Sequence, residues 1–316
     1  MGTPPKTLTV SIQRYDPERD TAPRSVAYEV PRQEGMVVAD VLQYLYEHQA
    51  PDLGFLWECR TRRCGTCAVR VGDRPVLTCS EPVCDGMQLS PLEGIPVIRD
   101  LIVDRQVLQE RLAPWAKENG NEPREVRVLL NPGEVAHYRA LSECIDCFIC
   151  DSVCPGLHEN TNAGPQFSGP RRLLRLEAQL QRRAESIPWL SYAVQGNPSL
   201  CTRCFACTEA CPRELRPAEA IGSLTSRLYK RQELDAHKTS HIRSFVNSVL
   251  RGGWLDEFRL LVDVYGPIGV GKFIPQALRL LRRGKLPKPH FGEAPQGKDI
   301  QTMLRGIERD RPCQSR

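Results

Sequence analysis

Twelve of the 14 cysteines fall into three tightly spaced groups, and no other feature of the sequence restricts the fold as strongly. The first group, with the spacing C-x4-C-x2-C-x11-C, comprises Cys59, Cys64, Cys67 and Cys79. The other two share the spacing C-x2-C-x2-C-x3-C-P and comprise Cys144, Cys147, Cys150 and Cys154, and Cys201, Cys204, Cys207 and Cys211. Any fold of this chain must accommodate the three sets of thiols.

Three chemistries use clustered cysteines: disulfides, structural zinc and iron–sulfur clusters. Disulfides need an oxidising compartment, and the N-terminus lacks the apolar segment of an export signal. Structural zinc usually takes two C-x2-C pairs from separate hairpins. The first spacing is instead typical of plant-type [2Fe–2S] domains, and the repeated one is typical of bacterial ferredoxins. The sequence therefore predicts one [2Fe–2S] and two [4Fe–4S] clusters.

The ligand sets follow from the same spacing. In two-cluster ferredoxins, the fourth ligand of each cluster comes from the other cysteine run. The expected sets are Cys59, Cys64, Cys67 and Cys79 for [2Fe–2S], Cys144, Cys147, Cys150 and Cys211 for one [4Fe–4S], and Cys154, Cys201, Cys204 and Cys207 for the other. No catalytic residue and no metal besides this iron are expected. Cys84 is expected to be a buried small residue, and Cys313 an incidental thiol.

Hydrophobic periodicity predicts an α+β protein. Residues 7–15 and 25–30 alternate as two strands of a hairpin, followed by a helix over 38–48 and short strands at 68–71, 76–79 and 87–90. This order is typical of a β-grasp ferredoxin domain. A helical patch is expected at 102–115 and a longer helix after Pro170.

Three domains are predicted from these elements. Residues 1–115 form the β-grasp [2Fe–2S] domain, with a linker to residue 135. Residues 136–235 form an all-α domain around the two repeated cysteine runs. Residues 236–316 form a basic helical extension, with helices expected at 242–250 and 255–265.

The charge is unevenly distributed along the chain. The formal net charge of +5 is too small to suggest a nucleic-acid binder. Residues 212–316, however, hold 20 Lys/Arg and 11 Asp/Glu, whereas residues 1–211 hold 23 and 27. Such a basic, apolar-interleaved tail fits a membrane surface, a partner subunit or a solvated helix. No run of 18 apolar residues exists, so no membrane-spanning helix is expected.

The order of the cysteine groups resembles the iron–sulfur subunit of succinate dehydrogenase and fumarate reductase over residues 6–235. The segments 10–17 (VSIQRYDP) and 92–104 (LEGIPVIRDLIVD) are similar to that family's first strand and to its bridge between domains. The resemblance implies a non-catalytic subunit of an oxidoreductase complex. A partner flavoprotein with covalent FAD oxidises succinate, and this subunit passes single electrons towards quinone. The implied location is peripheral, at the cytoplasmic face of the membrane, beside an anchor subunit.

The chain departs from the usual family pattern in three ways. Arg62 replaces a glycine of the first cysteine loop. Cys204 fills a position that is usually not Cys, where relatives hold [3Fe–4S]. A second [4Fe–4S] cluster is therefore expected here, with [3Fe–4S] as the alternative. His158, Glu159 and Thr202 stand where relatives have quinone-site Trp and His residues. These departures resemble an atypical branch that delivers electrons to a cysteine-rich subunit related to heterodisulfide reductase.

Two other functions stay open at this stage. The chain could serve another flavoprotein, such as a glycolate oxidase-like or a heterodisulfide/thiol-linked reductase. It could also be a ferredoxin-like carrier without a fixed partner. The identity of the flavoprotein distinguishes these alternatives, because the chain itself has no recognisable substrate site.

Overall fold

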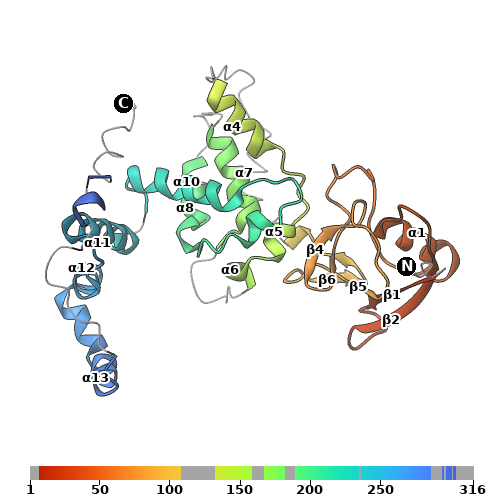
Figure 1. Ribbon diagram of the computed structural model, residues 1–316, viewed down its shortest axis with the longest axis horizontal. Coiled ribbons are helices and arrows are strands. Elements are labelled where there is room, and N and C mark those ends of the chain that lie inside the picture. The colour runs from red at the N-terminus through yellow and green to blue at the C-terminus, as the bar shows by residue number, and fades with distance from the viewer. Residues whose placement is uncertain are drawn as a thin grey trace. The chain divides into compact units, whose positions relative to one another are not determined.

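The computed structural model describes residues 7–107, 132–158, 167–181, 189–234 and 236–285, with residues 294, 297–300 and 302–303. The chain divides into two compact units, Met1–Leu228 and Tyr229–Arg316. All twelve clustered cysteines belong to the first unit, most of whose strands and helices are labelled in Figure 1.

The first unit begins with a five-stranded mixed sheet in the order β2-β1-β5-β3-β4. Strands β1 (Thr7–Arg14) and β2 (Arg24–Pro31) form the predicted antiparallel hairpin. Strand β1 also runs parallel to β5 (Met87–Ser90). Strand β3 (Ala68–Val71) pairs antiparallel with both β5 and β4 (Arg74–Leu77). The first cysteine loop therefore leads directly into a central strand.

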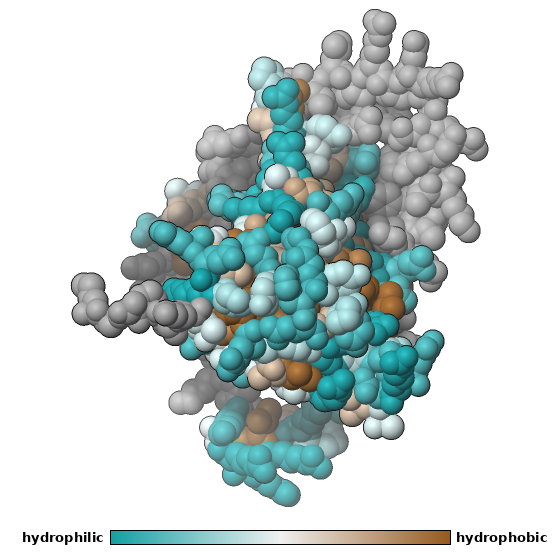
Figure 2. Space-filling model, turned by 90° about the vertical axis from the view of Figure 1, so that its right-hand side faces the viewer, coloured by the Kyte–Doolittle hydropathy of each residue, from teal (hydrophilic) through white to brown (hydrophobic). Residues whose placement is uncertain are grey.

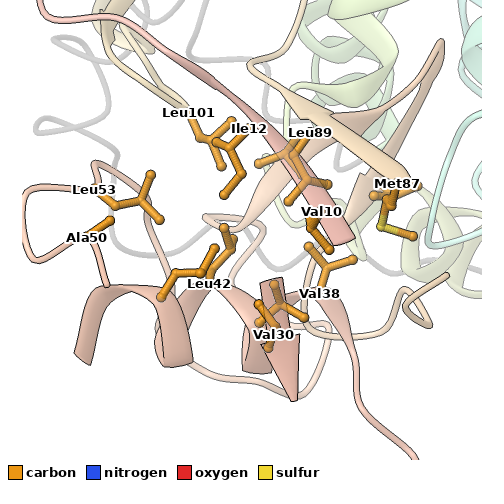
Figure 3. Close-up of a cluster of buried hydrophobic side chains, with 14 residues drawn as sticks. Val10, Ile12, Val30, Val38, Leu42, Ala50, Leu53, Met87, Leu89 and Leu101 are labelled. Carbon is orange, nitrogen blue, oxygen red and sulfur yellow. The ribbon is translucent and has the colours of Figure 1, made fainter. Parts of the chain in front are cut away.

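Helix α1 (Val38–His48) covers the apolar face of this sheet. The Asp40 carboxylate accepts a 2.9 Å hydrogen bond from the backbone N–H of Val37 at the start of the helix. Figure 3 shows Val10, Ile12 and Leu89 of the sheet gathered with Leu42 of the helix. The surface in Figure 2 is largely hydrophilic, with small separate apolar patches, because most large apolar side chains are inside.

Strand β1 carries a charge at its last inward position. Leu8, Val10 and Ile12 are buried in alternation, and the next inward side chain is Arg14, which is only 6% exposed. Its Nε donates to Asp100 Oδ1 at 3.0 Å, and its Nη1 donates to the Tyr28 hydroxyl at 2.7 Å. Burial acts to lower the pKa of Arg14, but the bonds to Tyr28 and Asp100 outweigh it and raise that pKa.

The Asp100 carboxylate in turn fixes two loops. It is 2% exposed and accepts backbone N–H bonds from Tyr15 at 2.8 Å and from Gly54 at 2.7 Å. Two cations compensate its negative charge: Arg14 at 3.0 Å and Arg99 at 3.9 Å. The buried pair ties the end of β1 to the loop after α1 and to the segment that leaves the sheet.

We expect Asp100→Asn to destabilise the chain by about 1–3 kcal/mol, because Arg14 then loses its buried carboxylate partner and keeps only the more exposed Asp52, at 2.7 Å. The measurement is denaturant unfolding of the cluster-loaded chain, followed by circular dichroism. Arg24→Ala is the control: it removes an exposed pair with Asp20 at 3.9 Å and should cost less than about 1 kcal/mol. Equal losses in the two variants would contradict a structural role for the buried pair.

One predicted helix is partly wrong. Within the expected helical patch at 102–115, Ile102–Val103 form strand β7, which pairs antiparallel with β6 (Val97–Arg99). The β-branched side chains of Ile102 and Val103 favour this extended pairing over a helix. Only residues 106–107 of the patch are helical among the described residues, and residues 108–115 lie outside them.

The rest of the first unit is helical. Its elements are α4 (Pro132–Ser142), α5 (Ile149–Ser152), α6 (Pro155–His158), α7 (Pro170–Gln181), α8 (Trp189–Gln195), η2 (Pro198–Leu200), α9 (Ala206–Glu209) and α10 (Pro217–Lys230). The predicted helix after Gly169 is confirmed as α7, with Leu173 and Leu176 fully buried.

The second unit consists of α11 (Ala236–Gly252), α12 (Glu257–Val270), η3 (Gly271–Phe273) and α13 (Ile274–Arg282). The Ser244 hydroxyl donates to Asp263 at 2.7 Å, which joins α11 to α12. Gly266, at φ 71°, and Pro267 kink α12. Both helices predicted in the tail are confirmed, although α11 begins earlier. None of the helices in the described ranges is long and apolar enough to cross a membrane.

Candidate iron–sulfur centres

The first cysteine loop directs backbone N–H groups at a single sulfur. Arg60, Arg62 and Gly65 all have positive φ, between 54° and 69°. The backbone N–H groups of Thr61, Arg63 and Cys64 donate to Cys59 Sγ at 3.4, 3.3 and 3.3 Å. This loop is preorganised to stabilise negative charge on sulfur, as a thiolate ligand requires.

The pKa values of these thiols follow their surroundings. The Thr61 side chain and the backbone N–H groups lower the pKa of Cys59 to about 6. Burial, reinforced by the thiols of Cys67 and Cys59, raises the pKa of Cys79 to about 11. Cys67 and Cys79 flank the β3–β4 hairpin, where Thr78 N–H donates to Cys67 O at 3.1 Å. The hairpin thus returns the distant Cys79 to the loop of the other three.

The two repeated cysteine runs have the same backbone conformation. In the first run Asp146 and Phe148 have φ values of 52° and 64°, and helix α5 begins directly after Phe148. In the second run Arg203 and Phe205 have φ values of 56° and 64°, and α9 begins directly after Phe205. The sequence repeat is therefore also a structural repeat.

The structure brings each run's fourth cysteine to the other run. One cavity, of about 350 Å³ with its open mouth, is lined by the thiol-bearing residues Cys144, Cys147, Cys150 and Cys211. A second cavity, of about 360 Å³, is lined by Cys154, Cys201, Cys204 and Cys207. These are the two crossed sets expected from the spacing, in cavities of nearly equal size.

The cysteine donors fit a polynuclear iron–sulfur group. Burial raises the pKa of Cys147 and of Cys207 to about 12, and that of Cys150 well above its ordinary value. Metal coordination compensates the cost of ionising such buried thiols. Among the described His, Cys, Asp and Glu residues, no three converge on a point where one metal ion fits. The crossed thiols instead surround cavities.

The first cysteine loop packs directly against the first repeated run. A Cβ added to Gly65 would lie 2.4 Å from Ile145 O and 3.0 Å from Cys147 N. Arg62 Nη2 donates to Pro212 O at 2.8 Å, immediately after Cys211. Arg62 has φ 59°, a backbone conformation that a glycine adopts more easily. Unlike a glycine at this position, Arg62 has a side chain that can donate the hydrogen bond to Pro212.

Sequence reasoning missed the charged groups around Phe148. This ring is 1% exposed, and the Arg171 guanidinium carbon lies 4.0 Å from its centroid. Arg171 is 2% exposed and forms ion pairs with Asp146 at 2.9 Å and with Asp151 at 3.1 Å. Arg171 lies in a helical segment rich in Arg and Leu, and nothing in its sequence neighbours indicates that this arginine is buried.

Two expectations concern cysteines outside the ligand sets. The expectation that Cys84 is buried is wrong, because this residue is exposed in the turn before β5. The neighbouring Asp85 and Gly86 are exposed as well, so this turn has no core to enter. Cys313 lies outside the described residues.

Comparison with known proteins agrees with the order of the two cysteine-bearing parts. A family model described as "2Fe-2S iron-sulfur cluster binding domain" matches residues 9–110. A second, described as "4Fe-4S dicluster domain", matches residues 140–215. The fumarate reductase iron-sulfur subunit of Escherichia coli O6:H1 is 32% identical over 225 residues, 68% of this chain and 91% of the relative. The chain belongs to the iron–sulfur subunit family of fumarate reductase and succinate dehydrogenase.

Other relatives extend this family relationship. A subunit of the CoM/CoB fumarate reductase of Methanothermobacter marburgensis is 32% identical over 73% of this chain, but only 47% of that relative is matched. The solved Mycobacterium smegmatis Sdh1 complex in the apo form contains a chain of the same fold, with a TM-score of 0.63. That chain is 24% identical, and the match covers 73% of this chain and 98% of the other. By family membership, the protein carries one [2Fe–2S] cluster and [4Fe–4S] clusters.

We expect Gly65→Ala to lower both the iron content and the melting temperature, because its Cβ has no room beside Ile145 O. The measurements are iron per chain and thermal unfolding. Gly72→Ala is the matched control: Gly72 also has positive φ, at 58°, but no atom lies within 4 Å of its added Cβ. It should cost only the conformational strain of about 1–2 kcal/mol and keep its iron. Similar iron losses in the two variants would show that the close packing at Gly65 is unimportant.

Proposed function

We propose that this chain is the electron-transfer subunit of a succinate dehydrogenase or fumarate reductase complex, without a catalytic residue of its own. It passes single electrons between the FAD of a partner flavoprotein and a membrane-side acceptor. The observation that carries the proposal is the placement of three complete thiol sets in one compact unit. The N-terminal fold, a five-stranded sheet covered by α1, supports a β-grasp ferredoxin domain as the first carrier.

The proposed ligands of the three clusters are the three sets of four cysteines described above. Bound clusters each accept or release one electron, whereas a flavin exchanges two. The chain's own part is to hold the thiols, shield them from water and keep the sites close. A shared apolar cluster contributes to this, since Cys67, Leu92 and Val103 pack with Cys147 and Phe148. This cluster joins residues of the first site to residues of the second.

Both ends of the proposed electron path have exposed apolar side chains beside them. Beside Cys59, the side chains of Leu56 and Trp57 are 42% and 48% exposed, next to the exposed Arg63. At the other end, Cys204 is exposed and its neighbour Phe205 is 43% exposed. Exposed apolar groups next to both terminal sites support a flavoprotein contact at the first and an acceptor contact at the last.

The acceptor is proposed to be a cysteine-rich subunit at the cytoplasmic face of the membrane. The CoM/CoB relative has about half of its length outside the matched region, which leaves room for an acceptor part within its own chain. We propose that this acceptor subunit binds the helices of residues 229–285. His158, the candidate for a modified quinone site, is exposed and packs on Gly94, and it does not line either cavity.

The same relative favours one alternative. Its name couples fumarate reductase to CoM and CoB, so a thiol-linked electron donor or acceptor is a second candidate for this complex. A glycolate oxidase-like flavoprotein has no comparable observation in its favour.

Cys211→Ser and Cys204→Ser test the crossed ligand sets. We expect Cys211→Ser to damage the cluster of Cys144, Cys147 and Cys150, because its thiol lines that cavity. Cys204→Ser should convert the other [4Fe–4S] to a [3Fe–4S] cluster, visible by EPR in the oxidised protein. The two variants are controls for each other. If Cys211→Ser changed only the cluster of Cys201, Cys204 and Cys207, the crossed assignment would be refuted.

Isolation of the tagged full-length chain from its native cells tests the function. We expect a flavoprotein with covalent FAD to co-purify, and the complex to reduce a dye with succinate and reoxidise reduced viologen with fumarate. Deletion of residues 229–316 should leave the dye reaction intact and reduce transfer to the native acceptor to background. Activity with glycolate or thiols alone would favour the alternatives. Full native-acceptor activity after the deletion would exclude the tail as the acceptor's binding element.

A further inference from the structure

The inference concerns Arg105, which lies between the first and second cysteine sites and has no assigned role. Its Nη2 donates to Thr66 O at 2.6 Å and to Gly65 O at 3.1 Å. These two carbonyl groups belong to the residues between the ligands Cys64 and Cys67. The guanidinium is thus fixed on the inner side of the first cysteine loop.

The same guanidinium reaches the second site. Its carbon lies 5.4 Å from the centroid of the Phe148 ring, and Phe148 stands between Cys147 and Cys150. Burial lowers the pKa of Arg105, while the nearby thiols of Cys147, Cys67 and Cys64 act in the opposite direction. One cation therefore faces thiols of both proposed ligand sets.

The charge of Arg105 has no carboxylate partner within the described part of the chain. None of the ion pairs there involves Arg105, and its buried Nε has no hydrogen-bond partner. Arg171, on the same Phe148 ring, differs because Asp146 and Asp151 neutralise it. A partly buried cation without a counter-ion is costly, so negative charge nearby is strongly stabilised.

We propose that the positive charge of Arg105 raises the reduction potentials of both the [2Fe–2S] cluster and the adjacent [4Fe–4S] cluster. Adding an electron makes a cluster more negative, so a nearby cation stabilises its reduced form. Transfer moves one electron from the reduced first cluster to the oxidised second cluster. Arg105 keeps its proton throughout and stabilises that electron on both sides of the step. The inference rests on the ligand sets of the proposed function, but not on the partner or substrate.

An EPR-monitored redox titration of the full-length complex with chemical mediators tests the proposal. We expect Arg105→Gln to lower the midpoint potentials of both clusters together. Arg105→Lys keeps the charge and should stay closer to wild type at both. Arg63→Gln is the control in the same loop: its side chain is exposed, so water screens its charge and any shift should be small and confined to the first cluster.

Several results would overturn the proposal. If only the midpoint potential of the [2Fe–2S] cluster fell, the charge of Arg105 would act on the first cysteine site alone. An equal fall in the Gln and Lys variants would assign the effect to the lost hydrogen bonds instead of the charge. Unchanged potentials with normal iron content would leave Arg105 a structural residue. If Arg105→Gln cannot hold iron, Arg105→Met replaces it as the neutral variant: potentials at both clusters below those of Arg105→Lys support the charge, and a difference at one cluster alone contradicts it. Because mediators supply the electrons, a wrong flavoprotein assignment would not change these outcomes.

Discussion

The fold of the first unit depends on one requirement: buried thiols must surround groups that are larger than a single ion. Burial raises the pKa of Cys147, Cys150 and Cys207, so these sulfurs remain protonated unless metal compensates their charge. Left-handed residues such as Phe148 and Phe205 turn each run tightly enough to point three thiols at one cavity. Because the fourth cysteine of each run lines the other run's cavity, the two cavities depend on each other. Neither site is complete until both runs have folded.

The first cysteine loop contacts the repeated runs through close packing and hydrogen bonds. Gly65 lies against the backbone of Cys147, Arg62 bonds to the residue after Cys211, and Arg105 spans the junction. These contacts fix the first site relative to the second without a covalent link. Short, fixed separations between sites are what single-electron transfer requires, so the packing that stabilises the unit also serves its proposed function.

The sequence predicts the parts of this structure that rest on local rules. The alternation of Leu8, Val10 and Ile12 predicts β1, and cysteine spacing predicts which thiols gather. It does not predict long-range charge placement. The paired residues Arg14 and Asp100 are 86 positions apart in the sequence. Arg105 donates a hydrogen bond to Gly65, which lies 40 positions earlier. Local helical periodicity also fails at Ile102 and Val103, where tertiary pairing makes a strand. The partners of such residues come together only in the folded chain.

The central claim is that all three thiol sets of one chain hold clusters at the same time. Iron and acid-labile sulfide analysis of the full-length protein, purified without oxygen and combined with Mössbauer spectroscopy, tests it most directly. The account predicts about ten iron and about ten sulfide per chain, divided between one [2Fe–2S] and two [4Fe–4S] clusters. About nine iron with a [3Fe–4S] spectrum would contradict the role of Cys204. About two iron would show that the crossed cavities do not hold clusters, and the proposed electron path would fail.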